Sequence, residues 1–191
     1  MDFYSINNKK FYRRSYTKNV LQKGEYTECT FTDCNFENSD LSNISFLECA
    51  FVNCNLSNTN VTHTTFNNIN FERCKLVGVL FQNCNDFLIA FRFKDCTLNL
   101  SSFYNMKINK TTFLDCKMHH IDFTETTIKS SLFSNCDLTG SIFDSSNLEN
   151  TNFATSYNFS INPSRNKVKN AIFSKDNCFG LLDSFQIKIN K

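Results

Sequence analysis

The sequence predicts an all-β solenoid, a rod in which short repeated units wind around a filled core. An apolar residue recurs every five positions along most of the chain, and 22 of the 191 residues are Phe, so one large apolar side chain fills a recurring slot. Only four Gly and one Pro occur, whereas a sandwich or barrel needs many tight turns that usually use both. A period of five matches neither the alternation of a plain strand nor the 3.6-residue period of an amphipathic helix.

The five-residue series begins at Tyr26 and reaches Phe81 without an exception. It breaks at Asp86, resumes two residues out of phase at Leu88, and continues to Phe153. A second slot, two residues before each apolar centre, holds mainly Cys, Ser, Thr, Ile or Val, with Phe91 and Met106 as exceptions. The other three positions are rich in Asn, Asp, Thr, Glu and Lys. This regularity over most of the chain predicts one repetitive domain.

Segments such as Cys34-Asn35-Phe36-Glu37-Asn38 and Cys136-Asp137-Leu138-Thr139-Gly140 resemble the pentapeptide-repeat family. The unit of that family is a small residue, a polar residue, Leu or Phe, and two more polar residues. The resemblance covers roughly residues 26–156. It implies a right-handed quadrilateral β-helix with four pentapeptides per coil, in which the repeat itself makes the corners, and this accounts for the shortage of Gly and Pro.

With four repeats per coil, residues twenty apart stack on one another, and residue types then sort by face. One face carries a predicted column of seven Phe: Phe31, Phe51, Phe71, Phe93, Phe113, Phe133 and Phe153. The fourth face carries Tyr26, Phe46, Phe66, Leu88, Ile108, Ile128 and Leu148. At ~4.8 Å per coil, six and a half coils give a rod about 31 Å long.

Three parts follow from this pattern: a basic N-terminal segment at 1–25, the solenoid at 26–156, and a C-terminal cap and dimerisation module at 157–191. The sequence predicts a short helix from Lys175 to Ser184 with Asp176 as its N-cap, and a final strand from Phe185 to Ile189. Apolar residues three apart would share one helix face and form the interface of a homodimer, which is the usual way to bury such a patch. These residues are Phe179, Leu182 and Phe185.

Six of the ten cysteines fall on one face of the predicted rod, one per coil: Cys34, Cys54, Cys74, Cys96, Cys116 and Cys136. Parallel inward side chains do not converge on a metal ion. Their spacing would allow disulfides, but the expected compartment is reducing. No stretch of eighteen apolar residues and no secretory signal is present, so we expect a cytoplasmic protein without a membrane span. The sequence therefore predicts buried free thiols.

No catalytic residue, cofactor or metal site is expected. The three histidines, His63, His119 and His120, lie at outward positions without a fixed spacing from a cysteine or carboxylate. No nucleotide-binding, hydrolase or metalloprotease motif occurs. A solenoid this narrow has a filled interior, which leaves no natural pocket. These observations predict a binding protein and not an enzyme.

The charge is divided along the chain. Residues 1–25 carry a net charge of +4, residues 26–160 hold fourteen acids and eight bases for a net of −6, and residues 161–191 carry +4, which together give +2. Outward acids on two adjoining faces, with Asp86 and Phe87 extruded at the break, are the candidate partner-binding residues. The acids are Glu28, Asp33, Glu48, Asp95 and Asp115.

Two functions agree with these features. The first is a scaffold that binds an unidentified protein partner through its outer faces. The second comes from a resemblance to the quinolone-resistance pentapeptide proteins, which implies a dimeric mimic of duplex DNA that binds DNA gyrase or topoisomerase IV. No direct binding of nucleic acid is expected. Binding by the basic ends is a minor alternative, because it would need outward aromatic side chains for stacking. The N-terminal candidates for stacking are Phe3, Tyr4, Phe11, Tyr12 and Tyr16.

Overall fold

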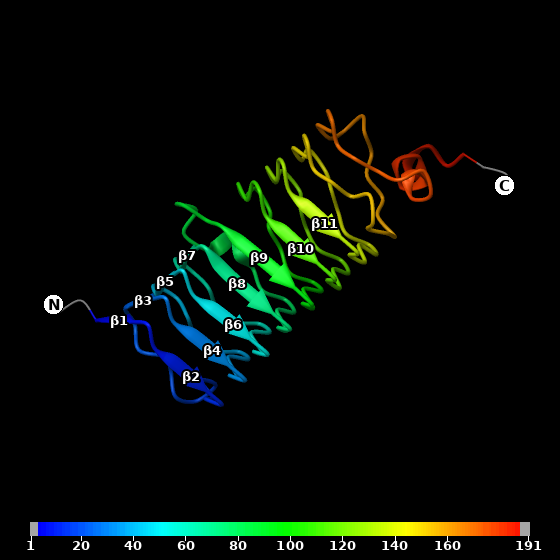
Figure 1. Ribbon diagram of the computed structural model, residues 1–191. Coiled ribbons are helices and arrows are strands. Elements are labelled where there is room, and N and C mark those ends of the chain that lie inside the picture. Colours follow the sequence, from blue (N-terminus) through cyan, green and yellow to red (C-terminus); the bar gives the residue numbers. More distant parts are fainter. Residues whose placement is uncertain (1–3, 188–191) are drawn as a thin grey trace.

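The computed structural model describes residues 4–187 and shows one rod, with the N-terminus at one end and the C-terminus at the other (Figure 1). It confirms the predicted right-handed quadrilateral β-helix. The strands are β1 (Ser5–Asn7), β2 (Lys10–Tyr12), β3 (Glu25–Thr27), β4 (Thr30–Thr32), β5 (Ser45–Leu47), β6 (Ala50–Val52), β7 (Thr65–Asn67), β8 (Ile69–Glu72), β9 (Phe91–Lys94), β10 (Thr112–Leu114) and β11 (Leu132–Ser134). Short 3-10 turns are η1 (Phe81–Asn83), η2 (Cys178–Leu181) and η3 (Asp183–Phe185).

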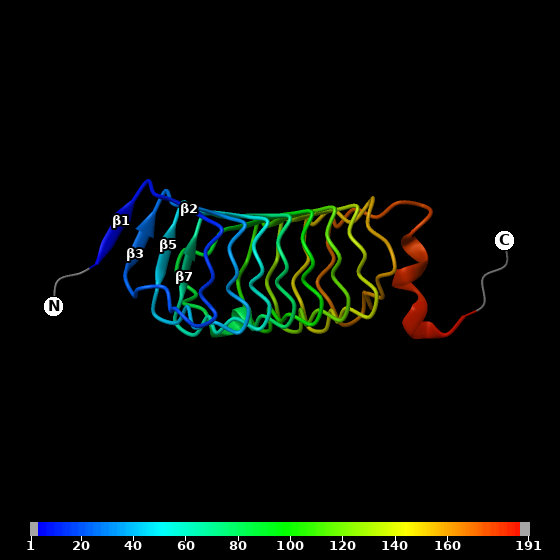
Figure 2. The ribbon, with the colours of Figure 1, turned by 90° about the horizontal axis from the view of Figure 1, so that it is seen from below.

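All strand pairs are parallel, and each coil lies twenty residues from the next. One sheet has the order β1-β3-β5-β7, and the other runs along the rod as β2-β4-β6-β8-β9-β10-β11. Across the break, the register changes to twenty-two, so that Phe71 lies opposite Phe93. The two remaining faces carry isolated parallel bridges, such as Asn35 with Asn55. Figure 2 shows these coils stacked side by side, as a four-sided solenoid requires.

The core contains a Phe column of nine rings where the sequence predicted seven. Successive rings are stacked with centroids 4.6 to 5.4 Å apart. Phe11 and Phe173 add one ring at each end. The seven rings between them are no more than 1% exposed. Parallel in-register stacking buries these apolar faces over the whole length of the rod and provides its main stabilisation.

The solenoid begins earlier than the repeat pattern indicated. β1 pairs with β3 and β2 pairs with β4, so residues 5–25 form a first coil instead of a separate segment. Ile6, Phe11, Tyr16 and Leu21 pack against the core at the slots one coil before Tyr26 and its successors. The step of five continues backwards from Tyr26 through these four residues.

The corners use the left-handed backbone region at residues other than Gly. In most repeats, the residue two positions after the apolar centre has a φ near +55°, as at Asn38 and Asn53. Asn tolerates this region better than most residues because its short side chain can bond locally. The residue before the centre often closes the turn, as where the Ser57 N–H donates to Asn55 Oδ1 at 3.1 Å. Asn and other residues, among them Glu28 and Asp33, therefore occupy the positions where other turns would need Gly.

The break differs from the sequence prediction in one respect. Leu88 was expected in the core, but it is 60% exposed and has a φ of +55°. Phe91, the exception in the small-residue slot, is buried instead, with its ring 5.8 Å from Phe66 and 5.4 Å from Phe81. The prediction for Leu88 is wrong because the inserted residues push the expected centre outward, and the larger Phe91 fills the space from the next slot.

The C-terminal segment caps the rod without forming an α-helix. Isolated bridges continue to Ile172, beyond the predicted end of the repeat at 156. The predicted N-cap at Asp176 is wrong, because η2 starts after Asn177. The Asn177 side-chain amide donates to the carbonyls of Phe153, Ala154 and Ser156 at 2.8 to 3.3 Å, which satisfies carbonyls of the last coil.

The predicted strand at 185–189 does not form over the residues that the structure describes. Phe185 lies in η3, and residues 186–187 form no strand. Residues 188–189 lie outside the described residues. No helix within residues 4–187 has the length and apolar character needed to cross a membrane.

Candidate functional site

Because side chains fill the interior of the rod, any binding site must lie on its outer faces or at its ends. Within residues 4–187, no group of three or more His, Cys, Asp or Glu is arranged to hold a metal ion. The six cysteines of the ladder are buried, as predicted, and are free thiols. Cys54 Sγ donates to the Phe31 carbonyl at 3.3 Å, and Cys74 Sγ donates to the Phe51 carbonyl at the same distance. The cysteines are thus core residues bonded to the backbone.

Burial contributes to a raised pKa at several of the core thiols. Hydrogen bonds with the neighbouring thiols and burial raise the pKa of Cys74, and burial raises the pKa of Cys49 to about 12. Burial alone raises the pKa of Cys84. Since the thiolate is the nucleophile and the metal ligand, these cysteines are poor candidates for either role.

Two acidic columns flank the seven-stranded sheet. The glutamate corner, Glu28 and Glu48, follows β3 and β5, and these two residues lie in register in adjacent coils. The aspartate corner follows the strands of the longer sheet and contains Asp33, Asp95 and Asp115, with Asn53 and Arg73 in the two coils between Asp33 and Asp95. Asp95 and Asp115 are in register as well, because β9 and β10 pair without a shift. The structure thus brings five of the predicted partner-binding acids to the two edges of one face.

Most of these acids keep their charge unpaired. Arg13 lies 3.8 Å from Asp33, which also accepts a hydrogen bond from Asn53 at 3.2 Å. Asp115 accepts one from Asn135 at 2.8 Å. No ion pair to the other four acids occurs within the described part of the chain. Their negative charge is available to a partner.

The face between the two corners is not uniformly acidic. At β4 and β6 it presents small, uncharged side chains, among them Thr30, Thr32 and Ala50, whereas β2 adds the exposed Lys10 at the N-terminal end. In the middle of the rod, the exposed Arg92 and Lys94 of β9 interrupt it. Glu72 pairs with Lys94 at 3.3 Å and with Arg73. The acidic surface therefore divides into an N-terminal part and a C-terminal part.

One side-chain pair was missed from the sequence. His119 Nε2 lies 2.9 Å from Asp137 Oδ2 on the face that carries the cysteine ladder beneath it. Burial raises the pKa of Asp137, but hydrogen bonds from Thr139, Asn158 and His119 outweigh burial and hold it at about 2. The two residues are eighteen positions apart, two fewer than one coil, and this separation could have indicated that they lie in adjacent coils. Asp137 Oδ1 also accepts a hydrogen bond from Thr139 Oγ1 at 2.7 Å, so the pair belongs to a local surface network.

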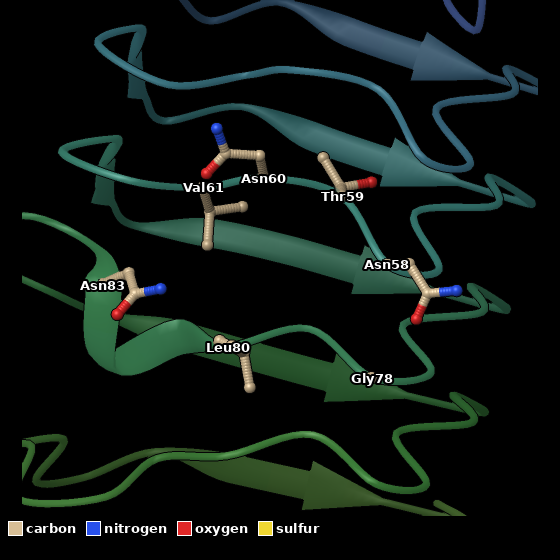
Figure 3. Close-up of a pocket in the computed structure, with 7 residues that line it drawn as sticks. All are labelled: Asn58, Thr59, Asn60, Val61, Gly78, Leu80 and Asn83. Carbon is tan, nitrogen blue, oxygen red and sulfur yellow. The ribbon is translucent and has the colours of Figure 1, made fainter.

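Figure 3 shows a hollow of about 230 Å³ on the side of the rod, between neighbouring coils. Its lining consists of Asn58, Thr59, Asn60, Val61, Gly78, Leu80 and Asn83. None of these side chains titrates near neutral pH. The hollow supplies neither an acid nor a base and does not support catalysis.

The break projects from the rod as the sequence indicated. Asp86 and Phe87 are exposed, with Phe87 at 68%, and Leu88 lies exposed beside them. A hollow of about 370 Å³ adjoins the projection and is lined in part by Asp86, Tyr104 and Met106. Gln82, which also lines this hollow, has a buried side-chain oxygen without a hydrogen-bond partner within the described residues. The projection gives this side of the rod a distinctive shape.

The candidate dimer residues lie at the C-terminal end. Phe179 is 49% exposed and Phe185 is 55% exposed, while Leu182 is half-buried. The Leu182 N–H donates to the Phe179 carbonyl at 2.8 Å and the Phe185 N–H donates to the Leu182 carbonyl at 3.0 Å, so two consecutive turns link the three residues. Behind them, Gly180 packs so closely on Phe159 that a side chain there would have no room. The apolar residues are thus presented on a supported surface.

Comparisons with known proteins agree with this geometry. A family model described as "Pentapeptide repeat region" matches residues 25–92 and 81–157. No curated protein matches the sequence.

Two solved structures have a similar fold. A trypsin-treated form of QnrB1, a plasmid-mediated fluoroquinolone resistance protein, superposes with a TM-score of 0.77 at 13% identity, over 98% of this chain and 92% of that one. HetL, a pentapeptide-repeat protein involved in heterocyst differentiation regulation in the cyanobacterium Nostoc sp. strain PCC 7120, gives 0.65 at 11% identity, over 89% and 85%. At these identities the likeness concerns the fold alone.

Proposed function

We propose that this chain, which belongs to the pentapeptide-repeat family, is a non-enzymatic scaffold that binds a protein partner through its outer solenoid faces. The observation that carries the proposal is the pair of acidic corners on either side of one sheet. The rod fixes the spacing of these carboxylates, so little conformational entropy is lost when a rigid partner binds. The contact residues are Glu28, Asp33, Glu48, Asp95 and Asp115, with Asp86 and Phe87 as a separate projection.

The carboxylates select a basic partner surface. Two of their stacked pairs hold like charges in neighbouring coils, about 5 Å apart at the spacing of a parallel sheet. Such pairs cost stability in the free protein, and a cation placed against both would relieve the repulsion. A partner with Lys or Arg at a matching spacing therefore gains from each pair, and its affinity falls as salt screens the charges.

Site-specific photo-crosslinking in cells tests the scaffold proposal. A crosslinking residue at position 115 lies on the aspartate corner, whereas one at position 62 lies on a different face and serves as the matched control. A partner captured from position 115, and lost when Glu28, Glu48 and Asp95 are changed to Lys, supports the proposal. Equal capture from both positions, or the same capture by the charge-reversed rod with unchanged circular dichroism, contradicts it.

The second candidate is a mimic of duplex DNA that binds DNA gyrase or topoisomerase IV. The stacked acid pairs and the fold similarity to QnrB1 favour it. Duplex DNA carries one negative charge per ~1.7 Å, which is about three per coil of this rod. The rod has a net charge of only −6 over residues 26–160, from fourteen acids and eight bases. A mimic of this kind would therefore use its two local acidic regions and not a continuous charged face.

A supercoiling assay tests this candidate directly. If the protein binds gyrase as a DNA mimic, it changes supercoiling or quinolone inhibition, added DNA competes, and reversal of Asp95 and Asp115 to Lys weakens the effect. Unchanged supercoiling and unchanged quinolone inhibition, with the protein well above the enzyme concentration, would leave only the generic scaffold.

We also propose that two chains pair through their C-terminal ends. Two-fold pairing buries Phe179, Leu182 and Phe185 of both subunits and leaves no open apolar end. Light scattering of the full chain is expected to give a dimer, and removal of residues 175–191 is expected to give a monomer or an aggregate. A monomeric full chain at micromolar concentration would refute the pairing.

A further inference from the structure

The N-terminal end of the rod has a hollow of about 470 Å³ that combines cations with aromatic rings. Its lining consists of Lys9, Lys10, Phe11, Tyr12, Arg14, Ser15, Tyr16, Asn19 and Val20. Lys9, Lys10 and Arg14 are exposed, and no acid within residues 4–187 forms an ion pair with them. The hollow therefore presents a concentration of positive charge.

The aromatic rings in this hollow are the last members of stacks that run through the core. One face of Phe11 is covered by Phe31 at 4.6 Å with an interplanar angle of 6°, and one face of Tyr16 is covered by Phe36 at 4.6 Å with 12°. Within the described residues, no other ring stacks on the opposite face of either one. The stack can therefore be continued by a planar ring from outside.

Cations already lie near two of these rings. Lys9 Nζ is 5.7 Å from the centre of the Phe11 ring, and the Arg13 guanidinium is 4.8 Å from that of Tyr12. Burial raises the pKa of Tyr16 to about 12, so this ring stays neutral and does not repel an anion at neutral pH. The hollow thus offers a stacking surface and cations within one small volume.

We propose that this end of the rod binds a nucleotide, either free or in a single strand of nucleic acid, with the base stacked on Tyr16 and the phosphate held by Lys9, Lys10 and Arg14. A planar base continues the aromatic stack, and a phosphate neutralises cations that have no acid beside them. An acidic protein segment would use the cations but not the ring face. The site is independent of the acidic corners of the rod.

The probe is a fluorescein-labelled thymidine oligonucleotide of about twelve residues, titrated with the full chain by fluorescence anisotropy. The double variant Lys10→Ala/Arg14→Ala is expected to weaken binding about tenfold or more. The matched control, Lys167→Ala/Lys169→Ala, removes the same charge from the other end of the rod and is expected to change binding less than twofold. If each of the three cations neutralises one phosphate of the strand, affinity is expected to fall about 18-fold between about 50 and about 200 mM salt.

The stacking contribution is tested separately. Tyr16→Leu keeps the half-buried slot apolar but removes the ring, and is expected to weaken oligonucleotide binding about 5- to 150-fold. Binding of inorganic tripolyphosphate, which has no base, should not change. If Tyr16→Leu perturbs the circular dichroism, an abasic oligonucleotide of the same length replaces this test and is expected to bind the parent protein more weakly by a similar factor. Competition by thymidine monophosphate shows that a free nucleotide suffices, whereas binding of the oligonucleotide alone assigns the site to a strand.

Three results would overturn the proposal. They are equal losses in the two double variants, displacement of the labelled oligonucleotide by tripolyphosphate or polyglutamate as effectively as by unlabelled oligonucleotide at the same phosphate or carboxylate concentration, and the absence of binding at low salt. The first two would show attraction by net charge or a preference for an acidic peptide. Because none of the substituted residues lies on the acidic corners, failure here leaves the scaffold proposal unaffected.

Discussion

Replacement of Phe113 by Ala tests the role of the Phe column. Phe113 is fully buried, its ring stacks on Phe93 at 5.1 Å and on Phe133 at 4.7 Å, and two further rings meet it edge-on. The rigid coils above and below limit collapse of the space, so we expect the full loss for a buried Phe, about 4 kcal/mol of unfolding free energy.

The matched variant is Phe11→Ala at the end of the same column. Phe11 is half-buried and has one stacked neighbour, Phe31, instead of two. We therefore expect a smaller loss of about 1 to 2 kcal/mol. Each coil of a solenoid is stabilised mainly by contacts with its two neighbours. The difference between the two losses of unfolding free energy therefore measures the contribution of the second neighbouring coil, which Phe11 lacks.

Urea unfolding followed by far-ultraviolet circular dichroism measures both losses at the same protein concentration. Phe113→Asp should prevent folding altogether, because the variant buries an unpaired charge. Equal losses for Phe113→Ala and Phe11→Ala would refute the nearest-neighbour reasoning. A loss of less than about 0.5 kcal/mol for Phe11→Ala would show that residues 5–25 are not an integral coil of the rod.

Three further predictions concern other parts of the rod. Cys74 is expected to react with a thiol reagent only as fast as the rod unfolds, because burial and a raised pKa protect it; rapid labelling of native protein would contradict this. Phe91→Ala should destabilise the rod by about 3 kcal/mol in urea unfolding, although the sequence places Phe91 in a small-residue slot; a change under about 1 kcal/mol would show that it does not fill the break. The pKa of Asp137 is lowered to about 2, so its stabilisation is complete above its unfolded pKa near 3.9 and is lost as the pH falls towards 2. Asp137→Asn should therefore be less stable than the parent protein at pH 6, with the difference shrinking by pH 2; a constant difference would contradict the assignment.

Most of the fold could be predicted because each position of the pentapeptide has the same structural role in almost every repeat. The centre points inward and the polar residues make the corner, so a single pattern determines the Phe column and the position of each outward acid. The same logic extends back to Ile6, and the sequence pattern contained that information in the step of five. The boundary at residue 25 came from starting the series at Tyr26, one coil later than the structure does.

The acidic corners were predicted in part. Stepping by twenty places Asp95 beside Asp115, but it does not reveal that Arg92 and Lys94 lie on the face between the corners. It also leaves the pair of His119 with Asp137 hidden, because side-chain reach between coils depends on rotamers and not on register. The basic residues of the N-terminal segment were visible in the sequence, yet their hollow exists only because the first coil is closed.

The sequence by itself determined the repeat, the identity of the stacked faces, the burial of the cysteines and the outward placement of the acids, because each follows from a local five-residue rule. Only the tertiary structure decided the break and the two ends. At the break, Leu88 leaves the core position that periodicity assigned to it, and Phe91 fills the space from the neighbouring small-residue slot, because the inserted residues extend outward while the core remains filled. At the ends, the stack has no further coil to follow, so the exposed ring faces of Phe11 and Tyr16 and the cap of Asn177 depend on where the rod stops, which a repeating local rule does not specify.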